Sequence, residues 1–410
     1  MAKHLLKILI KSFKNMSKII FLSSVLLISQ CIYGQNYNYE IPQQLDGWET
    51  GSIYNTSIKV DSLFSLINRI KDGTFGKVHS ILLIKDGKLA FEQYFGGYEW
   101  SYFTHDLNGV YVDFDINSLH TLHSVTKVLT SLLVGIAIDK GFIKNENETV
   151  FSYFPEYKEL SDSIKEKITI KHLLTFTSGL QWNELDEPLM GNPNNDLVKL
   201  MGKVVGVPDS LRIDNKIAFV LSKPQIAEPG TRWYYSAGDM LILSQILKKA
   251  TGMRLDYFAE KYLFKPLDIR KYDMELIDKD LINPWGMLRL RPRDLAKIGY
   301  LFINKGQWKG KQIVSPDWLQ KSVNKYMDIP FITEEWGKLS YGYQWFLRET
   351  IINNKKVNYF FRPGMGGNCV AVFPDYGAVF VITAGFWPSD GPVNKIMDNY
   401  LILAIMTDNK

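Results

Sequence analysis

The chain has 410 residues, of which 46% are hydrophobic, and 48 lysines and arginines stand against 43 aspartates and glutamates. Its net charge of +5 equals the five lysines of residues 1–34, a segment that contains no acid, so residues 35–410 are formally neutral. This balance argues against nucleic-acid binding, and a chain of this length can bury a core large enough to fold without disulfides.

The first 34 residues have the pattern of a cleavable signal peptide. Five lysines precede the apolar residues 19–28, and the small Gly34 stands before Gln35. The apolar run is shorter than the roughly 20 residues that a membrane-spanning helix needs, and the bulky Gln30 before Cys31 disfavours lipid attachment. We therefore expect export to the periplasm or the exterior, with membrane contact only during export. Cys369 then remains as the only cysteine, so no internal disulfide can form.

Hydrophobic spacing predicts secondary structure along the rest of the chain. Asp86-Gly87 between two apolar runs is a strong hairpin signal. In the first part of the chain we expect a helix at 61–70, strands at 79–85 and 88–95, and a buried helix at 128–138 ended by Gly141. Helices and long loops are expected over about 150–275, where the clearest helix is 239–250, closed by Gly252. The last part is expected to contain strands at 356–361, 369–373 and 378–384 and a final helix at 394–406.

Strands near both ends of the sequence, with helices between them, favour an α+β fold. We expect one antiparallel sheet built from both chain ends and flanked by helices, with an all-helical insert. Without a repeat or a low-complexity linker, residues 35–410 are expected to form a single domain. Its sheet part covers about 45–150 and 280–410, and its helical insert covers about 151–279.

The segment Ser124-Val125-Thr126-Lys127, at the start of the buried helix, can form a nucleophile with its base. A serine hydroxyl needs a nearby group to accept its proton, and a lysine three residues later on a helix lies within reach. The helix start also favours negative charge at the serine oxygen and disfavours a protonated lysine. The alternative is structural, with Ser124 as a helix cap and Lys127 exposed to solvent.

Two later segments can add to such a site. Tyr235 lies in Trp233-Tyr234-Tyr235-Ser236-Ala237-Gly238, directly before the predicted helix at 239–250, and a tyrosine near a lysine can pass protons. In Arg362-Pro363-Gly364-Met365-Gly366-Gly367-Asn368, small residues allow a substrate carbonyl to approach a backbone N–H. The structural alternatives are a half-buried aromatic loop and an ordinary glycine-rich turn.

Together these three segments resemble the serine hydrolases related to class C β-lactamases and penicillin-binding proteins, whose two-subdomain β-lactamase/transpeptidase-like fold is then expected here. The broad secreted members and the aminohexanoate-dimer hydrolases are most similar. The resemblance covers about residues 45–405. Further segments that carry it are Asp46-Gly47-Trp48, Leu82-Leu83-Ile84-Lys85-Asp86-Gly87-Lys88, residues 169–180, residues 288–296 and Tyr341-Gly342-Tyr343-Gln344-Trp345.

The resemblance implies a role for each motif residue. Ser124 would be the nucleophile that forms an acyl-enzyme, Lys127 would keep it deprotonated, and Tyr235 would shuttle the proton. The backbone N–H groups of Ser124 and Asn368 would hold the oxyanion, which makes the Gly366-Gly367-Asn368 turn part of the mechanism. No cofactor or metal is implied. The implied partner is a small-molecule or peptide-like ester or amide, and the oligomeric state stays open.

The chain departs from this family at two positions. Ala237 replaces the asparagine that usually ends the second motif, and Met365 stands where the third motif usually opens with lysine or histidine. Methionine offers an apolar surface in place of a cation. We therefore expect esters or amides with an apolar acyl side to bind better than β-lactams or D-Ala-D-Ala carboxylates. Four tryptophans are candidates for the cleft lining: Trp182, Trp233, Trp285 and Trp345.

Three functions agree with these residues. The first is an exported serine hydrolase that acts on an ester or amide through Ser124. The second, motivated by Ala237 and Met365, is a binding or sensor protein with weak or no catalysis. The third is a β-lactamase or D,D-carboxypeptidase. A metal site is not expected, since His120 and His123 have no evident third ligand.

Overall fold

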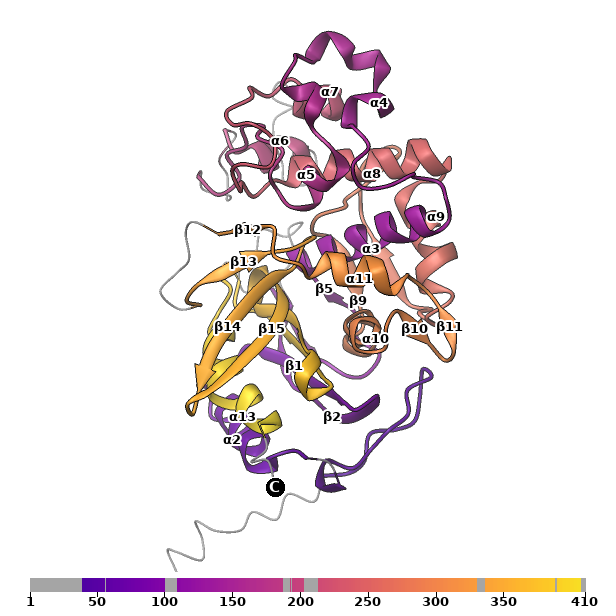
Figure 1. Cartoon of the computed structure of the whole chain (residues 1–410). Coiled ribbons are helices and arrows are strands. Elements are labelled where there is room, and N and C mark those ends of the chain that lie inside the picture. Colours follow the sequence, from indigo (N-terminus) through magenta and orange to yellow (C-terminus); the bar gives the residue numbers. More distant parts are fainter. Residues whose placement is uncertain are drawn as a thin grey trace, which may run out of the picture. The chain divides into compact units, whose positions relative to one another are not determined.

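The computed structural model (Figure 1) describes residues 39–55, 57–99, 109–186, 192, 194–202, 213–329, 336–387 and 389–406. The predicted signal peptide lies outside the described residues. The chain divides into two units, Met1–Glu40 and Ile41–Lys410, and the following description concerns the second. Within the described residues, no helix is both long and apolar enough to cross a membrane.

An eight-stranded antiparallel sheet forms the lower half of this unit in Figure 1. It joins the two ends of the sequence, because the N-terminal hairpin adds to six strands of the C-terminal part through the pairing of β1 with β17. In spatial order the strands are β12 (Met327–Asp328), β13 (Leu339–Tyr341), β14 (Phe346–Ile352), β15 (Lys355–Gly364), β16 (Asn368–Phe373), β17 (Ala378–Ala384), β1 (Val78–Lys85) and β2 (Lys88–Tyr94). The antiparallel sheet built from both chain ends is thus present as predicted.

The sheet is the centre of the hydrophobic core. Strands β1, β16 and β17 are buried at every residue, so their side chains are covered on both faces. Helix α10 (Pro292–Ile303) packs on these three strands. Helix α2 (Val60–Lys71) packs against the C-terminal helical segment, which consists of α12 (Val393–Ile396), a π-helical turn (Met397–Leu401) and α13 (Ile402–Ile405).

A helical region lies above the sheet in Figure 1. At its base α3 (Thr126–Asp139) packs on α8 (Ala237–Thr251), and almost every side chain of α3 is buried. The other helices are α4 (Val150–Tyr153), α5 (Ile170–Leu174), α6 (Asp196–Met201), α7 (Lys216–Leu221), α9 (Leu255–Ala259) and α11 (Pro316–Ser322). Short strands complete the unit: β3 (Gly96–Glu99) with β4 (Val110–Asp113), β5 (His120–Thr121) with β9 (Leu288–Leu290) and β6 (Tyr272–Met274), β7 (Leu276–Asp278) with β8 (Leu281–Ile282), and β10 (Gln307–Trp308) with β11 (Lys311–Gln312).

Candidate active site

Ser124 lies in a single 3₁₀ turn, His123–Val125, directly before α3. Strand β15 fixes this turn from the side. Gly364 passes so close that a Cβ atom there would lie 2.3 Å from the Leu122 carbonyl oxygen, so only glycine fits. The Arg362 Nε donates a hydrogen bond of 2.9 Å to the Ser124 carbonyl oxygen. The junction of α3 with the sheet therefore sets the position of the serine.

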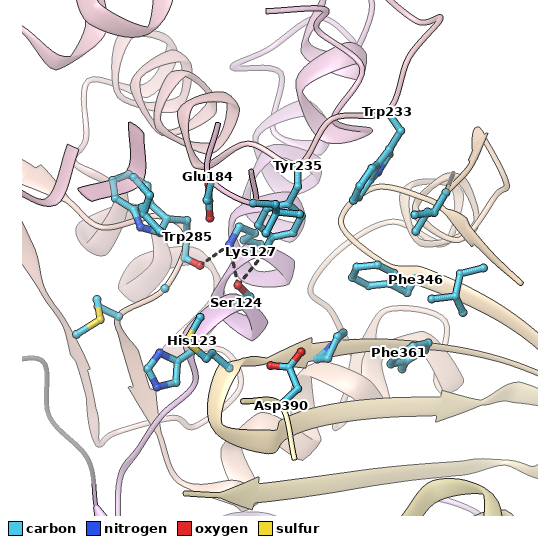
Figure 2. A pocket seen from close by; sticks show the side chains of 18 of the residues that line it. His123, Ser124, Lys127, Glu184, Trp233, Tyr235, Trp285, Phe346, Phe361 and Asp390 are labelled. Carbon is cyan, nitrogen blue, oxygen red and sulfur yellow. Dashed lines mark hydrogen bonds between the residues drawn. The ribbon is translucent and has the colours of Figure 1, made fainter. Parts of the chain in front are cut away.

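The side chains of Ser124, Lys127 and Tyr235 meet at this junction (Figure 2). The Lys127 Nζ donates to the Ser124 Oγ at 2.9 Å and to the Trp285 carbonyl oxygen at 3.0 Å. The hydroxyls of Ser124 and Tyr235 share a hydrogen bond of 2.7 Å. The serine oxygen thus lies between a lysine and a tyrosine at hydrogen-bond distance, as an activated nucleophile requires.

Burial controls the protonation of this cluster. Lys127 is 1% exposed, and burial lowers its pKa well below the usual value, with the positive charge of Arg362 acting in the same direction. A lysine with a lowered pKa is available as a proton acceptor near neutral pH. Burial raises the pKa of Tyr235 to about 12, although Arg362 opposes this rise. Tyr235 therefore starts as a phenol that can donate a proton.

Arg362 is a member of the site that the sequence reasoning did not single out. Its side chain is fully buried, and its Nη2 donates to the Tyr235 hydroxyl at 3.1 Å. Its Nη1 donates to the Gln344 carbonyl oxygen at 3.1 Å and to the Tyr341 hydroxyl. Arg362 therefore supplies a cation that contacts Tyr235. It lies three residues before Met365, the position at which the resemblance would place a lysine or histidine.

Glu184 is the second residue that the sequence reasoning missed. Its Oε2 accepts hydrogen bonds from the Trp182 Nε1 at 3.0 Å and from the Ala237 backbone N–H at 2.8 Å. Ala237 is the first residue of α8, so the carboxyl group also lies at the positive end of a helix. Figure 2 shows this group directed toward Lys127.

The cluster opens into a cavity of about 490 Å³. Ser124, Lys127, Tyr235 and Glu184 provide its polar part, and Asp390 lies on the opposite side of Ser124 (Figure 2). Most of the remaining lining is apolar: Leu185, Leu197, Met201, Trp233, Trp285, Met287, Ile329, Trp336, Leu339, Phe346, Phe361, Pro363 and Met365. The cavity therefore places a reactive hydroxyl against a largely apolar surface, as expected for a small-molecule site.

The predicted cleft residues divide into two groups. Trp233, Trp285 and Met365 line this cavity. Trp182, Ala237 and Trp345 are buried outside its lining. Trp182 and Ala237 hold Glu184, whereas Trp345 packs on Phe302 and Phe360 in the core. Trp182 and Ala237 therefore lie next to the site, but their side chains do not line the cavity.

The glycine-rich turn after β15 lies on the far side of Met365. Gly366 and Asn368 line a second, smaller cavity, and the Asn368 Nδ2 donates to the Met365 carbonyl oxygen at 3.0 Å. Gly367 is buried against Phe386 and Ala384. Asn368 therefore braces the backbone at Met365 and does not face the main cavity.

Three histidines border this second cavity, and two of them, His79 and His120, are buried. His79 and His120 both stack on Phe114, with ring centroids 4.1 Å and 4.6 Å from it, and His123 stacks on Trp387. Burial lowers the pKa values of His79, His120 and His123 from 6.5 to about 4, about 3 and about 4. The folded protein therefore keeps all three rings neutral at physiological pH.

We expect stability to fall as the pH drops below 6.5. The unfolded chain then binds protons at these histidines while the folded chain does not, so the free energy of unfolding decreases until the folded pKa values are reached, near pH 4 to 3. Each histidine contributes a slope of up to about 1.4 kcal/mol per pH unit. Urea unfolding between pH 7.5 and 5 measures this loss. His120→Gln is expected to have a shallower dependence, and an equal slope in both proteins would contradict the assignment.

The described residues contain no group of three or more histidine, cysteine, aspartate or glutamate side chains that could hold a metal ion.

Comparison with known proteins places the chain in a family. The family model described as Beta-lactamase matches residues 79–403. The chain belongs to the beta-lactamase family. Acyltransferase mokF of Monascus pilosus is 28% identical over 169 residues, which is 38% of this chain and 38% of that protein. The chain thus aligns with well under half the length of this curated relative.

Solved structures support the same fold. The hydrolase EstCE1, described as having promiscuous acyltransferase activity, has a TM-score of 0.63 at 15% identity over 86% of this chain and all of that one. The octameric penicillin-binding protein homologue of Pyrococcus abyssi has a TM-score of 0.61 at 19% identity, with 84% and 77% covered. The predicted β-lactamase/transpeptidase-like fold is therefore confirmed. Members of this family are serine hydrolases and acyltransferases, and an acyl-enzyme on a serine is in keeping with that chemistry.

Proposed function

We propose that this protein is an exported serine hydrolase that cleaves an ester or amide with an apolar acyl group, through an acyl-enzyme on Ser124. The observation that carries the proposal is the Ser124 Oγ, held at 2.9 Å from the Lys127 Nζ and 2.7 Å from the Tyr235 hydroxyl at the wall of an apolar cavity. Export rests on the charge and hydropathy of residues 1–34.

The reaction follows from these positions. The Ser124 Oγ attacks the substrate carbonyl carbon while its proton passes to the Lys127 Nζ. The leaving alcohol or amine departs with a proton that Tyr235 relays from Lys127. Water then attacks the acyl-enzyme, gives a proton to the same pair, and releases the acid as the Ser124 Oγ regains its proton.

We place the oxyanion site between the backbone N–H groups of Ser124 and Met365. Met365 lines the cavity beside Ser124, and Gly364 brings this strand against the Ser124 amide, since a Cβ at Gly364 would lie 3.3 Å from that nitrogen. Asn368, to which the resemblance gives this role, borders the other cavity. Two preorganised N–H donors stabilise the negative charge of a tetrahedral intermediate.

The lining also favours certain substrates. Aromatic and aliphatic side chains surround the serine, and the ionisable groups that face the cavity include the carboxyls of Glu184 and Asp390. The burial of an apolar acyl chain stabilises the complex by about 0.8 kcal/mol per CH₂. A substrate carboxylate meets like charges and an apolar Met365, so anionic β-lactams and peptide carboxylates are expected to bind poorly.

Fluorophosphonate labelling tests the proposal without knowledge of the natural substrate. The intact mass of residues 35–410 is expected to rise by a single adduct, and peptide mapping is expected to place that adduct on Ser124. Hydrolysis of p-nitrophenyl esters is expected to improve from acetate to hexanoate, and added alcohols reveal whether the acyl group also passes to an acceptor other than water. A well-folded sample without an adduct would instead favour the binding-protein hypothesis, and rapid turnover of an anionic β-lactam would favour the β-lactamase hypothesis.

A further inference from the structure

Glu184 is a buried carboxyl group that the reaction above does not use. It is 8% exposed, it lines the cavity, and its Oε2 is engaged by Trp182 and Ala237. The loop that carries it is fixed from behind, because the Asn195 Nδ2 donates to the Glu184 carbonyl oxygen at 3.1 Å. A carboxyl group held in this way has a fixed position relative to Lys127, toward which it points in Figure 2.

The charges around Glu184 explain what a carboxylate does at this position. Burial raises the pKa of Glu184, whereas the charges of Lys127 and Arg362 and the hydrogen bond from the N-terminus of α8 act in the opposite direction and favour the carboxylate. Tyr235 precedes the same helix, and the negative charge of Glu184 raises its pKa. Asp390 interacts with Tyr235 from the opposite side of Ser124. Lys127 is therefore flanked by one buried cation, Arg362, and by one buried carboxyl group, Glu184.

The acylation step makes this carboxyl group important. When Lys127 accepts the Ser124 proton, an ammonium ion forms at a side chain that is 1% exposed, beside the fully buried Arg362. Two cations in a buried site repel each other strongly, because the local dielectric is low. A carboxylate facing the new ammonium offsets this repulsion without any solvent rearrangement.

We propose that Glu184 is a positioning residue that supplies the counter-charge for the Lys127 ammonium formed during acylation. It acts through Lys127 and does not touch the reacting atoms. The inference rests on the proposed function, because it requires Lys127 to accept the serine proton. The backbone N–H of Ala237 holds the carboxyl group, and its short side chain adds no polar atom to the site.

Glu184→Gln keeps the shape and the hydrogen-bond acceptor but removes the charge. Without the carboxylate the pKa of Lys127 falls further, so the acidic limb of the kcat/KM profile is expected to move to lower pH by half a unit or more. The limiting kcat is expected to fall about tenfold or more with little change in KM for a neutral ester, since transition-state charge is affected and ground-state binding is not. Asp186→Asn is the matched control: it removes an exposed carboxylate two residues away, outside the cavity lining, and is expected to leave the profile unchanged.

A lower rate with an unmoved acidic limb would overturn the proposal and leave Glu184 a purely structural group.

A second measurement does not depend on activity. At a pH below the acidic limb, where Lys127 is protonated in the resting protein, Glu184→Gln is expected to change the melting temperature by a different amount in the wild-type chain than in a Lys127→Met chain, because the paired charge is then present only in the first. Equal changes of the melting temperature in both backgrounds would refute the coupling between Glu184 and Lys127, even if the wild-type protein reacted with no substrate. Unequal changes in a protein that a fluorophosphonate does not label would count against the proposed function alone.

Discussion

Replacement of Ser124 by alanine is expected to lower ester hydrolysis by about 10³-fold or more and to abolish fluorophosphonate labelling, since removal of a catalytic nucleophile has effects of at least this size. The melting temperature is expected to change little. The hydroxyl makes two hydrogen bonds, to Lys127 and Tyr235, and each partner keeps another one, with the Trp285 carbonyl oxygen and with Arg362. Initial rates on a p-nitrophenyl ester and thermal unfolding of the same sample measure both effects.

Ser131 provides a matched control in α3, the helix that directly follows the Ser124 turn. Its hydroxyl is buried and donates to the Tyr343 carbonyl oxygen at 3.1 Å, away from the cavity. Ser131→Ala is expected to lower stability by about 1 kcal/mol, as the loss of one buried hydrogen bond usually does, and to leave kcat unchanged. If Ser124→Ala kept the wild-type turnover rate, Ser124 would not be the nucleophile.

The fold could be predicted from the sequence where a local pattern determines the structure. The Asp86-Gly87 turn joins β1 to β2 with positive φ at both residues, 48° and 81°, which is the conformation that an Asp-Gly hairpin favours. Gly252 ends α8 in the left-handed conformation, as a helix-ending glycine does. The last helix is present but contains a π-helical turn, Met397–Leu401, which hydrophobic spacing does not indicate.

The site could be predicted only in part, for a physical reason. Ser124 and Lys127 are three residues apart, so helical geometry alone brings them together. Tyr235 is 111 positions from Ser124, and only the resemblance connected the two. Glu184 and Arg362 were missed because their proximity depends on a loop conformation and on the contact of β15 with the Ser124 turn. No periodicity in the sequence encodes such contacts.

Arg362→Met is expected to damage both stability and turnover. The guanidinium donates to the carbonyl oxygens of Ser124 and Gln344 and to the Tyr235 hydroxyl, and methionine removes this donor from three buried groups. Each such group costs about 1 kcal/mol or more, so the free energy of unfolding is expected to fall by about 3 kcal/mol. Loss of the positive charge also raises the pKa of Tyr235, already about 12, and weakens its proton relay. We expect kcat to fall about 10²-fold.

Arg293→Met separates the two effects. Arg293 is also fully buried, but its Nε donates to Glu92 at 2.8 Å and it lies outside the lining of the Ser124 cavity. Its loss is expected to lower stability by a similar amount or more, because it leaves a charged partner, and to leave kcat per folded molecule unchanged. Urea unfolding and kcat measured on both variants well below their melting temperatures make the comparison. If Arg362→Met keeps the wild-type kcat, the cation serves only to hold the turn before α3, and Tyr235 must relay protons without it.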